Sequence, residues 1–133
     1  MAHVSETEKL GIMLVEDHLA FRQVLASVLD REPDFEVVAQ AGSLAEARET
    51  LGARTLDGRI DVAVVDQGLP DGDGTELIEE LRRSSAGVSV VVLSATVRPE
   101  GVERVRRAGA DGVLDKVRSY SSIAEELRRV AGG

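Results

Sequence analysis

Short apolar runs recur along the chain, and each is followed by a segment whose apolar residues are spaced as on one face of a helix. Five runs stand out, at residues 12–16, 36–41, 61–66, 88–95 and 112–116. Several are nearly continuous rather than alternating, which is typical of strands covered on both faces, as in a parallel sheet. The alternation of five strands with five helices therefore predicts an α/β fold, with right-handed crossovers that place helices on both faces of the sheet.

The segments between the runs have the periodicity of amphipathic helices. In the first segment, apolar residues at spacings of three and four share one stripe: Phe21, Val24, Leu25, Val28 and Leu29. The later segments carry Ala47 and Leu51, then Leu77, Ile78 and Leu81, then Val102 and Val105, and finally Ile123, Leu127 and Val130. Each predicted helix therefore has one apolar face that can pack against the sheet.

Several residues indicate where the helices begin. Ser43 and Glu46 form the capping-box pattern at the start of the second helix. Pro99 suits the first turn of the fourth helix, where its missing N–H costs no hydrogen bond. Ser119 or Ser122 is expected to cap the last helix.

One doubly wound domain accounts for nearly the whole chain. At 133 residues the chain is long enough to bury roughly two thirds of its unfolded surface. No internal repeat, low-complexity tract or linker is visible. We expect the domain to occupy residues 10–131, with a disordered or frayed tail at 1–9 and a C-terminal end or truncated linker at 132–133.

Composition and charge exclude several classes of protein. The chain has no cysteine, so it forms neither a disulfide nor a thiolate metal site. Its formal net charge of −8 disfavours direct binding to nucleic acid, where phosphate contacts dominate affinity. The N-terminus is acidic where a signal peptide needs basic residues, and no apolar stretch is long enough for a membrane span. We therefore expect a soluble cytoplasmic protein without direct contacts to nucleic acid or membrane.

Polar residues at the ends of the predicted strands point to a site. In open α/β sheets, functional groups gather beyond the carboxyl ends of the strands. These ends carry five such residues: Glu16, Asp17, Asp66, Ser94 and Lys116. Crowded carboxylates are tolerated when a cation lies between them, and hard oxygen ligands suit Mg²⁺. Asp66 then acts as a nucleophile towards a phosphoryl group, while Lys116 neutralises charge and Ser94 donates a hydrogen bond.

Each of these residues also has a simpler interpretation on its own. Asp66 precedes a Gly-Pro loop and would be an ordinary turn residue, and Lys116 alone would be a solvated surface lysine. The segment from Asp71, "DGDGTE", suggests a calcium loop, but the sixth and twelfth positions are Glu76 and Arg82 rather than glycine and glutamate. Asp73 is instead expected to cap the third helix. The joint arrangement on one edge favours the functional interpretation over the separate ones.

These motifs together resemble those of a known family. Residues 10–131 are similar to response-regulator receiver domains of bacterial two-component systems, and most of all to the NarL/FixJ subfamily. The matching motifs are "VEDH", "VVDQGLPDGDG", "VVVLSA", "RRAGADG" and "LDK". The resemblance implies a flavodoxin-like (CheY-like) sheet with strand order 2-1-3-4-5 and five helices.

The resemblance also implies a role for each site residue. Asp66 accepts the phosphoryl group, and it holds Mg²⁺ together with Glu16, Asp17 and the backbone carbonyl of Gly68. Lys116 pairs with the phosphoryl group, and Ser94 is the hydroxyl that moves towards it. The phosphodonor is a histidine kinase or a phosphotransfer protein. The output is expected to be transcriptional, through a DNA-binding domain absent from this chain.

Two departures from the family pattern motivate an alternative. Val113 stands where the family usually has an aromatic residue, and Val117 where proline or aspartate is usual. The alternative is a phosphorylation-independent interaction module with a receiver-like fold.

A hydrolase with an aspartyl nucleophile is disfavoured, because such enzymes need a second aspartate at the position that Gly68 occupies here. We therefore expect slow self-dephosphorylation rather than dedicated enzyme activity. The charged surface formed by the fourth helix, fifth strand and fifth helix is expected to be a solvated face in preference to a homodimer interface.

Overall fold

A five-stranded parallel sheet is the centre of the computed structural model, which describes residues 9–53, 60–84, 87–95, 98–117 and 120–132. The strands are β1 (Leu10–Val15), β2 (Phe35–Ala41), β3 (Val62–Asp66), β6 (Ser89–Ser94) and β7 (Gly112–Asp115). They alternate with helices α1 (Leu19–Asp30), α2 (Leu44–Ala53), α3 (Gly74–Ser84), α4 (Pro99–Ala108) and α5 (Tyr120–Gly132). The predicted tail apart from residue 9, as well as Ser119 and Gly133, lies outside the described residues.

The strands are hydrogen-bonded in the order β2-β1-β3-β6-β7, and every neighbouring pair is parallel. Counted along the five strands of the sheet, this is the expected order 2-1-3-4-5, so the fold prediction is confirmed. Two short strands, β4 (Gly68–Leu69) and β5 (Gly72–Asp73), pair in the loop after β3 and form a small separate hairpin. The hairpin was not predicted because its residues have the composition of a turn.

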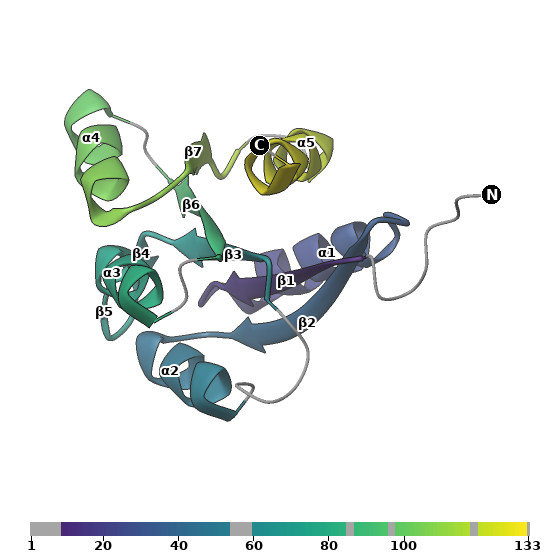
Figure 1. The fold of residues 1–133 in the computed structure, drawn as a ribbon, viewed down its shortest axis with the longest axis horizontal. Helices are drawn as coiled ribbons and strands as arrows, with labels where there is room; N and C mark the ends of the chain where they lie inside the picture. Colours follow the sequence, from purple (N-terminus) through teal and green to yellow (C-terminus); the bar gives the residue numbers. More distant parts are fainter. Residues whose placement is uncertain (1–8, 54–59, 85–86, 96–97, 118–119, 133) are drawn as a thin grey trace.

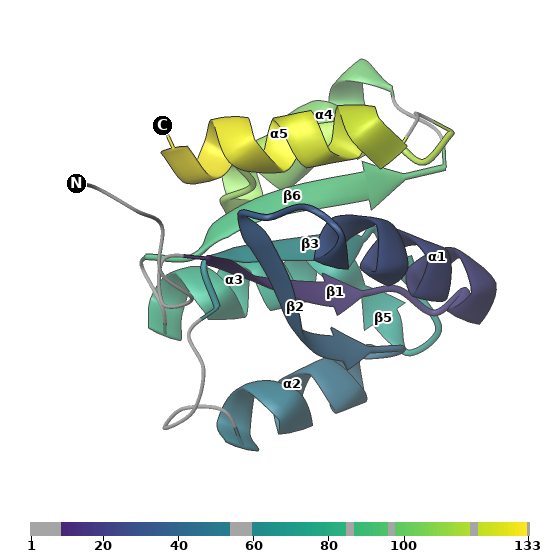
Figure 2. The same cartoon turned by 90° about the vertical axis from the view of Figure 1, so that its right-hand side faces the viewer.

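Helices cover both faces of the sheet, as the nearly continuous apolar strands predicted (Figures 1 and 2). One core cluster joins a sheet face to α2, α3 and α4, through residues such as Ala47, Leu77 and Val105. The other joins the opposite face to α1 and α5, through residues such as Leu25 and Ile123. β3 is buried along its whole length because it lies between these two layers. No described helix is long and apolar enough to cross a membrane.

Most predicted helix starts are confirmed. Pro99 lies in the first turn of α4. The backbone N–H of Glu46 donates to Ser43 Oγ over 3.1 Å at the start of α2. The Glu46 carboxylate accepts from Gly42 N rather than from Ser43 N, so the return bond of the capping box reaches one residue further back. Asp73 Oδ1 accepts from Thr75 N over 2.9 Å and caps α3 as expected.

Two expectations about individual side chains need correction, and one side chain has a role that was not predicted. Val24 is 45% exposed, because the buried face of α1 is formed by Leu25, Ala26 and Leu29. Ser122 does not cap α5, because it lies inside the helix, which begins at Tyr120. Asp71 has the unpredicted role: its carboxylate accepts hydrogen bonds from the first backbone N–H groups of α2.

Candidate functional site

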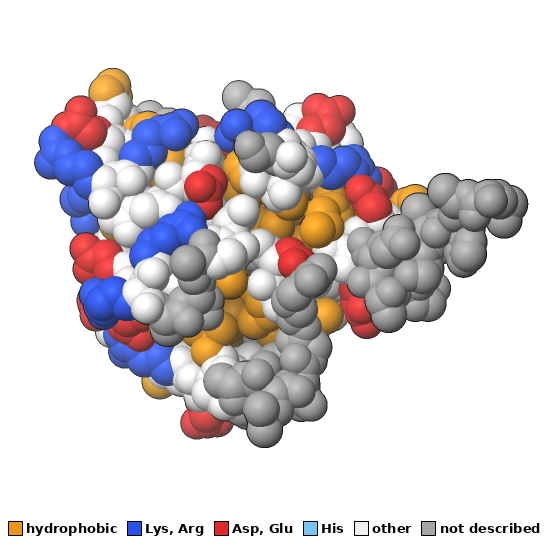
Figure 3. All heavy atoms as spheres, viewed as in Figure 1, with side chains coloured by type: hydrophobic (Ala, Val, Ile, Leu, Met, Phe, Trp, Pro, Cys, Tyr) orange, Lys and Arg blue, Asp and Glu red, His pale blue; other side chains and the backbone are white. Residues whose placement is uncertain are grey.

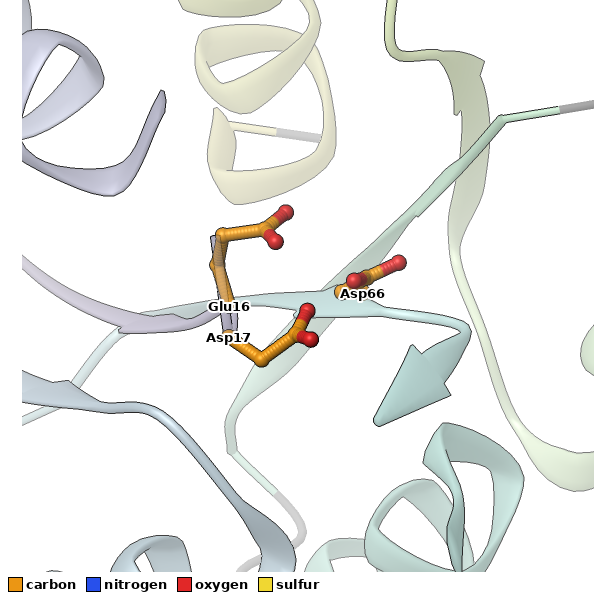
Figure 4. Close-up of side chains that lie close together, drawn as sticks. All are labelled: Glu16, Asp17 and Asp66. Carbon is orange, nitrogen blue, oxygen red and sulfur yellow. The ribbon is translucent and has the colours of Figure 1, made fainter. Parts of the chain in front are cut away.

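The residues predicted at the strand ends meet at one edge of the sheet. Glu16 and Asp17 directly follow β1, Asp66 ends β3, Ser94 ends β6 and Lys116 directly follows β7. Figure 4 shows the Glu16, Asp17 and Asp66 carboxylates reaching into the same space from the ends of two neighbouring strands. One oxygen from each of the three lies within 4.8 Å of the others. The geometry follows from the topology, because β1 and β3 are adjacent and parallel.

Two of the three carboxylates are withdrawn from solvent. Glu16 is 2% exposed and Asp66 6%, while Asp17 faces the solvent. Glu16 Oε2 accepts a hydrogen bond from His18 N over 2.8 Å, which fixes the carboxylate at the start of α1. Glu16 Oε1 is also buried, and it lies 2.7 Å from Lys116 Nζ. This buried oxygen and its two neighbouring carboxylates form a donor set that suits a hard divalent cation.

Lys116 supplies the positive charge of the site. Its Nζ lies 2.7 Å from Glu16 Oε1 and 3.6 Å from Asp66 Oδ2. The backbone N–H of Lys116 donates to the Ser94 carbonyl over 2.9 Å, so the end of β7 is tied to the end of β6. Burial acts to lower the pKa of Lys116, but the carboxylates of Glu16 and Asp66 raise it overall. Lys116 is therefore a fixed cation between two acids.

The pKa of Asp66 is raised because its carboxyl group is buried beside another acid. Burial is the main cause that raises the pKa of Asp66 to about 7, and the negative charge of Glu16 adds to it. Lys116 and the Gly68 N–H act in the opposite direction. Without a second cation the site thus disfavours the ionised Asp66, which is the form that a nucleophile requires.

A hollow of about 470 Å³ opens beside Asp66. It is lined by Asp66, Gln67, Gly68, Ser94, Ala95, Arg104 and Lys116. The buried Ser94 thus reaches the same space as the predicted nucleophile. Gly68 begins β4, and its N–H donates to Asp66 Oδ1 over 3.3 Å. The role of its carbonyl as a metal ligand stays a prediction.

A comparison with known proteins identifies the family. The model of the response regulator receiver domain matches residues 12–128. The chain belongs to the response-regulator receiver family. The transcriptional regulatory protein UhpA of Salmonella typhimurium is 37% identical over 125 residues, which cover 93% of this chain and 60% of UhpA. The chain spans only a little over half the length of such curated relatives.

Solved structures of response regulators have the same fold as this chain. The receiver domain of NarL from Mycobacterium tuberculosis superposes with a TM-score of 0.85 at 28% identity, over 95% of this chain and 98% of that one. A response regulator from Burkholderia pseudomallei, solved with a phosphorylated aspartic acid, a calcium ion and citrate, has a TM-score of 0.80 at 25% identity. Its match covers 93% of this chain and 69% of that one.

Two further residues of this receiver domain reach the site without having been predicted. Phe21 of α1 places its ring centroid 4.9 Å from Lys116 Nζ, and it also contacts the ring of Tyr120 at 6.0 Å between centroids. The sequence assigned Phe21 only to an apolar stripe. Arg104 of α4 lines the hollow next to Asp66. It lies in an arginine-rich helix, and no sequence signal separates it from its neighbours.

The charged surface of α4, β7 and α5 includes ion pairs within the chain. Basic and acidic side chains lie close together along the α4 edge of the molecule (Figure 3). Arg107 pairs with Glu103 along α4, and Arg129 pairs with Glu126 along α5. The Arg107–Glu103 pair is exposed on both sides, as is typical of a solvated face. That this surface is solvated in preference to forming a homodimer interface stays a prediction.

Proposed function

We propose that this receiver domain accepts a phosphoryl group on Asp66 in a Mg²⁺-dependent reaction and thereby switches its surface. The observation that carries the proposal is the contact of Lys116 Nζ with both Glu16 and Asp66, beside a hollow that Asp66 lines. This arrangement supports the proposal, because Asp66, a further acid and a cation lie together beside a hollow that could receive a phosphoryl group. The phosphorylated aspartate of the Burkholderia pseudomallei relative supports the same use of the site.

Each residue of the site has a distinct part in the phosphoryl transfer. An Asp66 carboxylate oxygen forms a bond to phosphorus as the bond between phosphorus and the donor breaks, and the electron pair of that bond leaves with the donor. Lys116 neutralises the phosphoryl oxygens, and the Ser94 hydroxyl donates a hydrogen bond to one of them. Glu16, Asp17, Asp66 and the Gly68 carbonyl would hold Mg²⁺. When bound, the ion offsets the crowded carboxylates and favours the ionised Asp66.

The phosphodonor in the cell is proposed to be a histidine kinase or a phosphotransfer protein. The relatives UhpA and DevR/DosR are named as transcriptional regulators, which supports a transcriptional output and a cytoplasmic location. That output would act through a DNA-binding domain outside this chain. The receiver domain would act as a phosphoacceptor rather than as a dedicated enzyme, and it would lose its phosphate slowly by self-dephosphorylation.

Labelling with a small phosphodonor tests the proposal. Wild-type protein incubated with Mg²⁺ and radiolabelled acetyl phosphate should gain a single phosphate that is stable in acid and lost in hydroxylamine. Asp66→Asn should not be labelled, and chelation of Mg²⁺ should abolish labelling of the wild type. Glu49→Gln, which removes an exposed carboxylate away from the site, is the matched control and should label normally. Equal labelling of Asp66→Asn and wild type would show that Asp66 is not the acceptor.

A second candidate is an interaction module that works without phosphorylation. Val117 is 86% exposed next to Lys116, so the loop after β7 presents an apolar side chain to solvent. A titration with Mg²⁺ and beryllofluoride, a phosphate mimic, separates the two functions. The phosphoacceptor should show changes in the NMR spectrum around residues 94–117, whereas the interaction module should show none.

A further inference from the structure

Arg104 is a second cation at the phosphorylation site, and it comes from a different element than Lys116. It lies in the middle of α4 and lines the hollow that Asp66, Ser94 and Lys116 also line. It also borders an adjoining hollow of about 310 Å³ at the start of α4. A guanidinium in this position borders the hollow that Asp66 also lines.

In the structure Arg104 is held by Asp73. Arg104 Nη1 donates to Asp73 Oδ2 over 2.8 Å, and the two side chains are 54% and 37% exposed. Ion pairs exposed to this extent contribute little to stability, because water screens them. Asp73 uses its other oxygen, Oδ1, to cap α3 through Thr75 N. Arg104 can therefore leave Asp73 without removing the helix cap.

We propose that Arg104 exchanges Asp73 for the phosphoryl group on Asp66. The inference rests on the proposed function and adds a second cation to it. A phosphoryl group carries about two negative charges and three acceptor oxygens, whereas the Asp73 carboxylate carries one charge and already uses one oxygen. The planar fork of a guanidinium matches two phosphoryl oxygens at once, which makes arginine a stronger partner for phosphate than for a single carboxylate oxygen.

The other arginines of α4 do not have this position. Arg107 pairs with Glu103 on the same helix, and Arg106 and Arg107 line a different hollow with Pro99 and Val102. Arg104 also directly precedes Val105, which is the buried anchor of α4. The exchange would replace a link between α4 and the start of α3 with a link between α4 and the phosphoryl group. Phosphorylation would thereby change how α4 is held, and with it the surface that α4 presents.

Beryllofluoride binding to the intact chain tests the exchange. With saturating Mg²⁺, Arg104→Met should weaken beryllofluoride binding roughly tenfold relative to wild type, which corresponds to about 1.4 kcal/mol. Arg104→Lys keeps the charge but loses the fork, so its affinity should lie between the two. Arg107→Met removes the same charge from the same helix and should change the affinity less than about twofold. Equal effects of Arg104→Met and Arg107→Met would overturn the inference.

A substitution of Asp73 should change beryllofluoride affinity in the opposite direction to Arg104→Met. Asp73→Asn keeps an oxygen that caps α3 but releases Arg104, so it should tighten beryllofluoride binding by about threefold or more. In an Arg104→Met background the same substitution should have no effect, because there is no arginine to release. Equal tightening in both backgrounds would mean that Asp73 acts only through its general negative charge, which would overturn the exchange.

The same experiment separates this inference from the proposed function. Wild type should bind beryllofluoride and Asp66→Asn should not. If wild type fails to bind, the proposed function fails and the exchange fails with it. If wild type binds and Arg104→Met binds equally well, only the exchange is refuted. Thermal unfolding of each variant checks that the exposed substitutions leave the fold intact.

Discussion

Asp66→Asn should stabilise the metal-free protein, although it removes the residue on which the function depends. Asp66 is 6% exposed, and one of its carboxylate oxygens lies within 4.8 Å of oxygens of two other acids. An asparagine has nearly the same shape and keeps an oxygen for the Gly68 N–H. The substitution therefore removes a buried charge without removing its hydrogen-bond acceptor.

The pKa of Asp66 sets the size of the effect. Burial and Glu16 raise this pKa from 3.8 to about 7. At about 1.4 kcal/mol for each pKa unit, the ionised carboxylate destabilises the folded state by about 4 kcal/mol. Asparagine gives up the attraction between Asp66 and Lys116 at 3.6 Å, which that value already includes. We expect a gain of about 2–4 kcal/mol in the free energy of unfolding, because the amide must still be desolvated.

The gain should depend on pH in a defined direction. The folded-state pKa of Asp66 is raised to about 7 from 3.8, so the stability associated with its proton is present at pH below about 4 and lost as the pH rises through 7. The advantage of Asp66→Asn should therefore be complete above pH 7 and almost absent near pH 4. Urea unfolding followed by circular dichroism, with a chelator present and at several pH values, measures it.

Two controls make the result decisive. Glu49→Gln removes one exposed negative charge and should change the free energy of unfolding by less than about 0.5 kcal/mol. Added Mg²⁺ should raise the free energy of unfolding of wild type but not that of Asp66→Asn, so the difference between the two free energies should become smaller. A gain of the same size at pH 5 and pH 8, or a loss of stability at pH 8, would refute the electrostatic account of Asp66.

Three substitutions outside the carboxylates test the packing around the site. Phe21→Leu removes the ring 4.9 Å from Lys116 Nζ and should cost about 1 kcal/mol in urea unfolding, with a smaller cost in a Lys116→Met background. Gly74→Ala would place a Cβ 2.5 Å from the Asp66 carbonyl, so it should cost about 1–3 kcal/mol and also weaken beryllofluoride binding. Gly109→Ala, at a φ of 120°, should cost more than about 1 kcal/mol in the same unfolding assay but leave beryllofluoride binding unchanged.

The parallel sheet and the grouping of the five polar residues could be foreseen for one physical reason, whereas the strand order was implied only by the family resemblance. Parallel strands need apolar residues on both faces, and their carboxyl ends then meet at one edge. Residues that end strands, such as Asp66 and Ser94, were therefore placed correctly without any knowledge of side-chain contacts. Lys116, which directly follows β7, was placed by the same rule.

Contacts between helices and loops far apart in the sequence were beyond such reasoning. Asp71 caps α2 from 27 residues away, and a turn-like sequence carries no sign of that partner. Phe21 was assigned to the apolar stripe of α1, but its distance to Lys116 depends on how α1 packs on the sheet relative to the residues after β7. Arg104 is 31 residues from Asp73, and its neighbours Arg106 and Arg107 have the same local sequence character.

The charges of the site indicate when Arg104 should move. With Asp66 ionised, three carboxylates face the single positive charge of Lys116, and one divalent cation cancels the difference. A phosphoryl group on Asp66 replaces one negative charge with about two, which leaves room for one more cation. Mg²⁺ alone should therefore leave the Arg104–Asp73 pair in place, and the NMR signal of the Arg104 guanidinium should shift only when beryllofluoride is added. A shift of that signal on addition of Mg²⁺ alone would contradict this order of events.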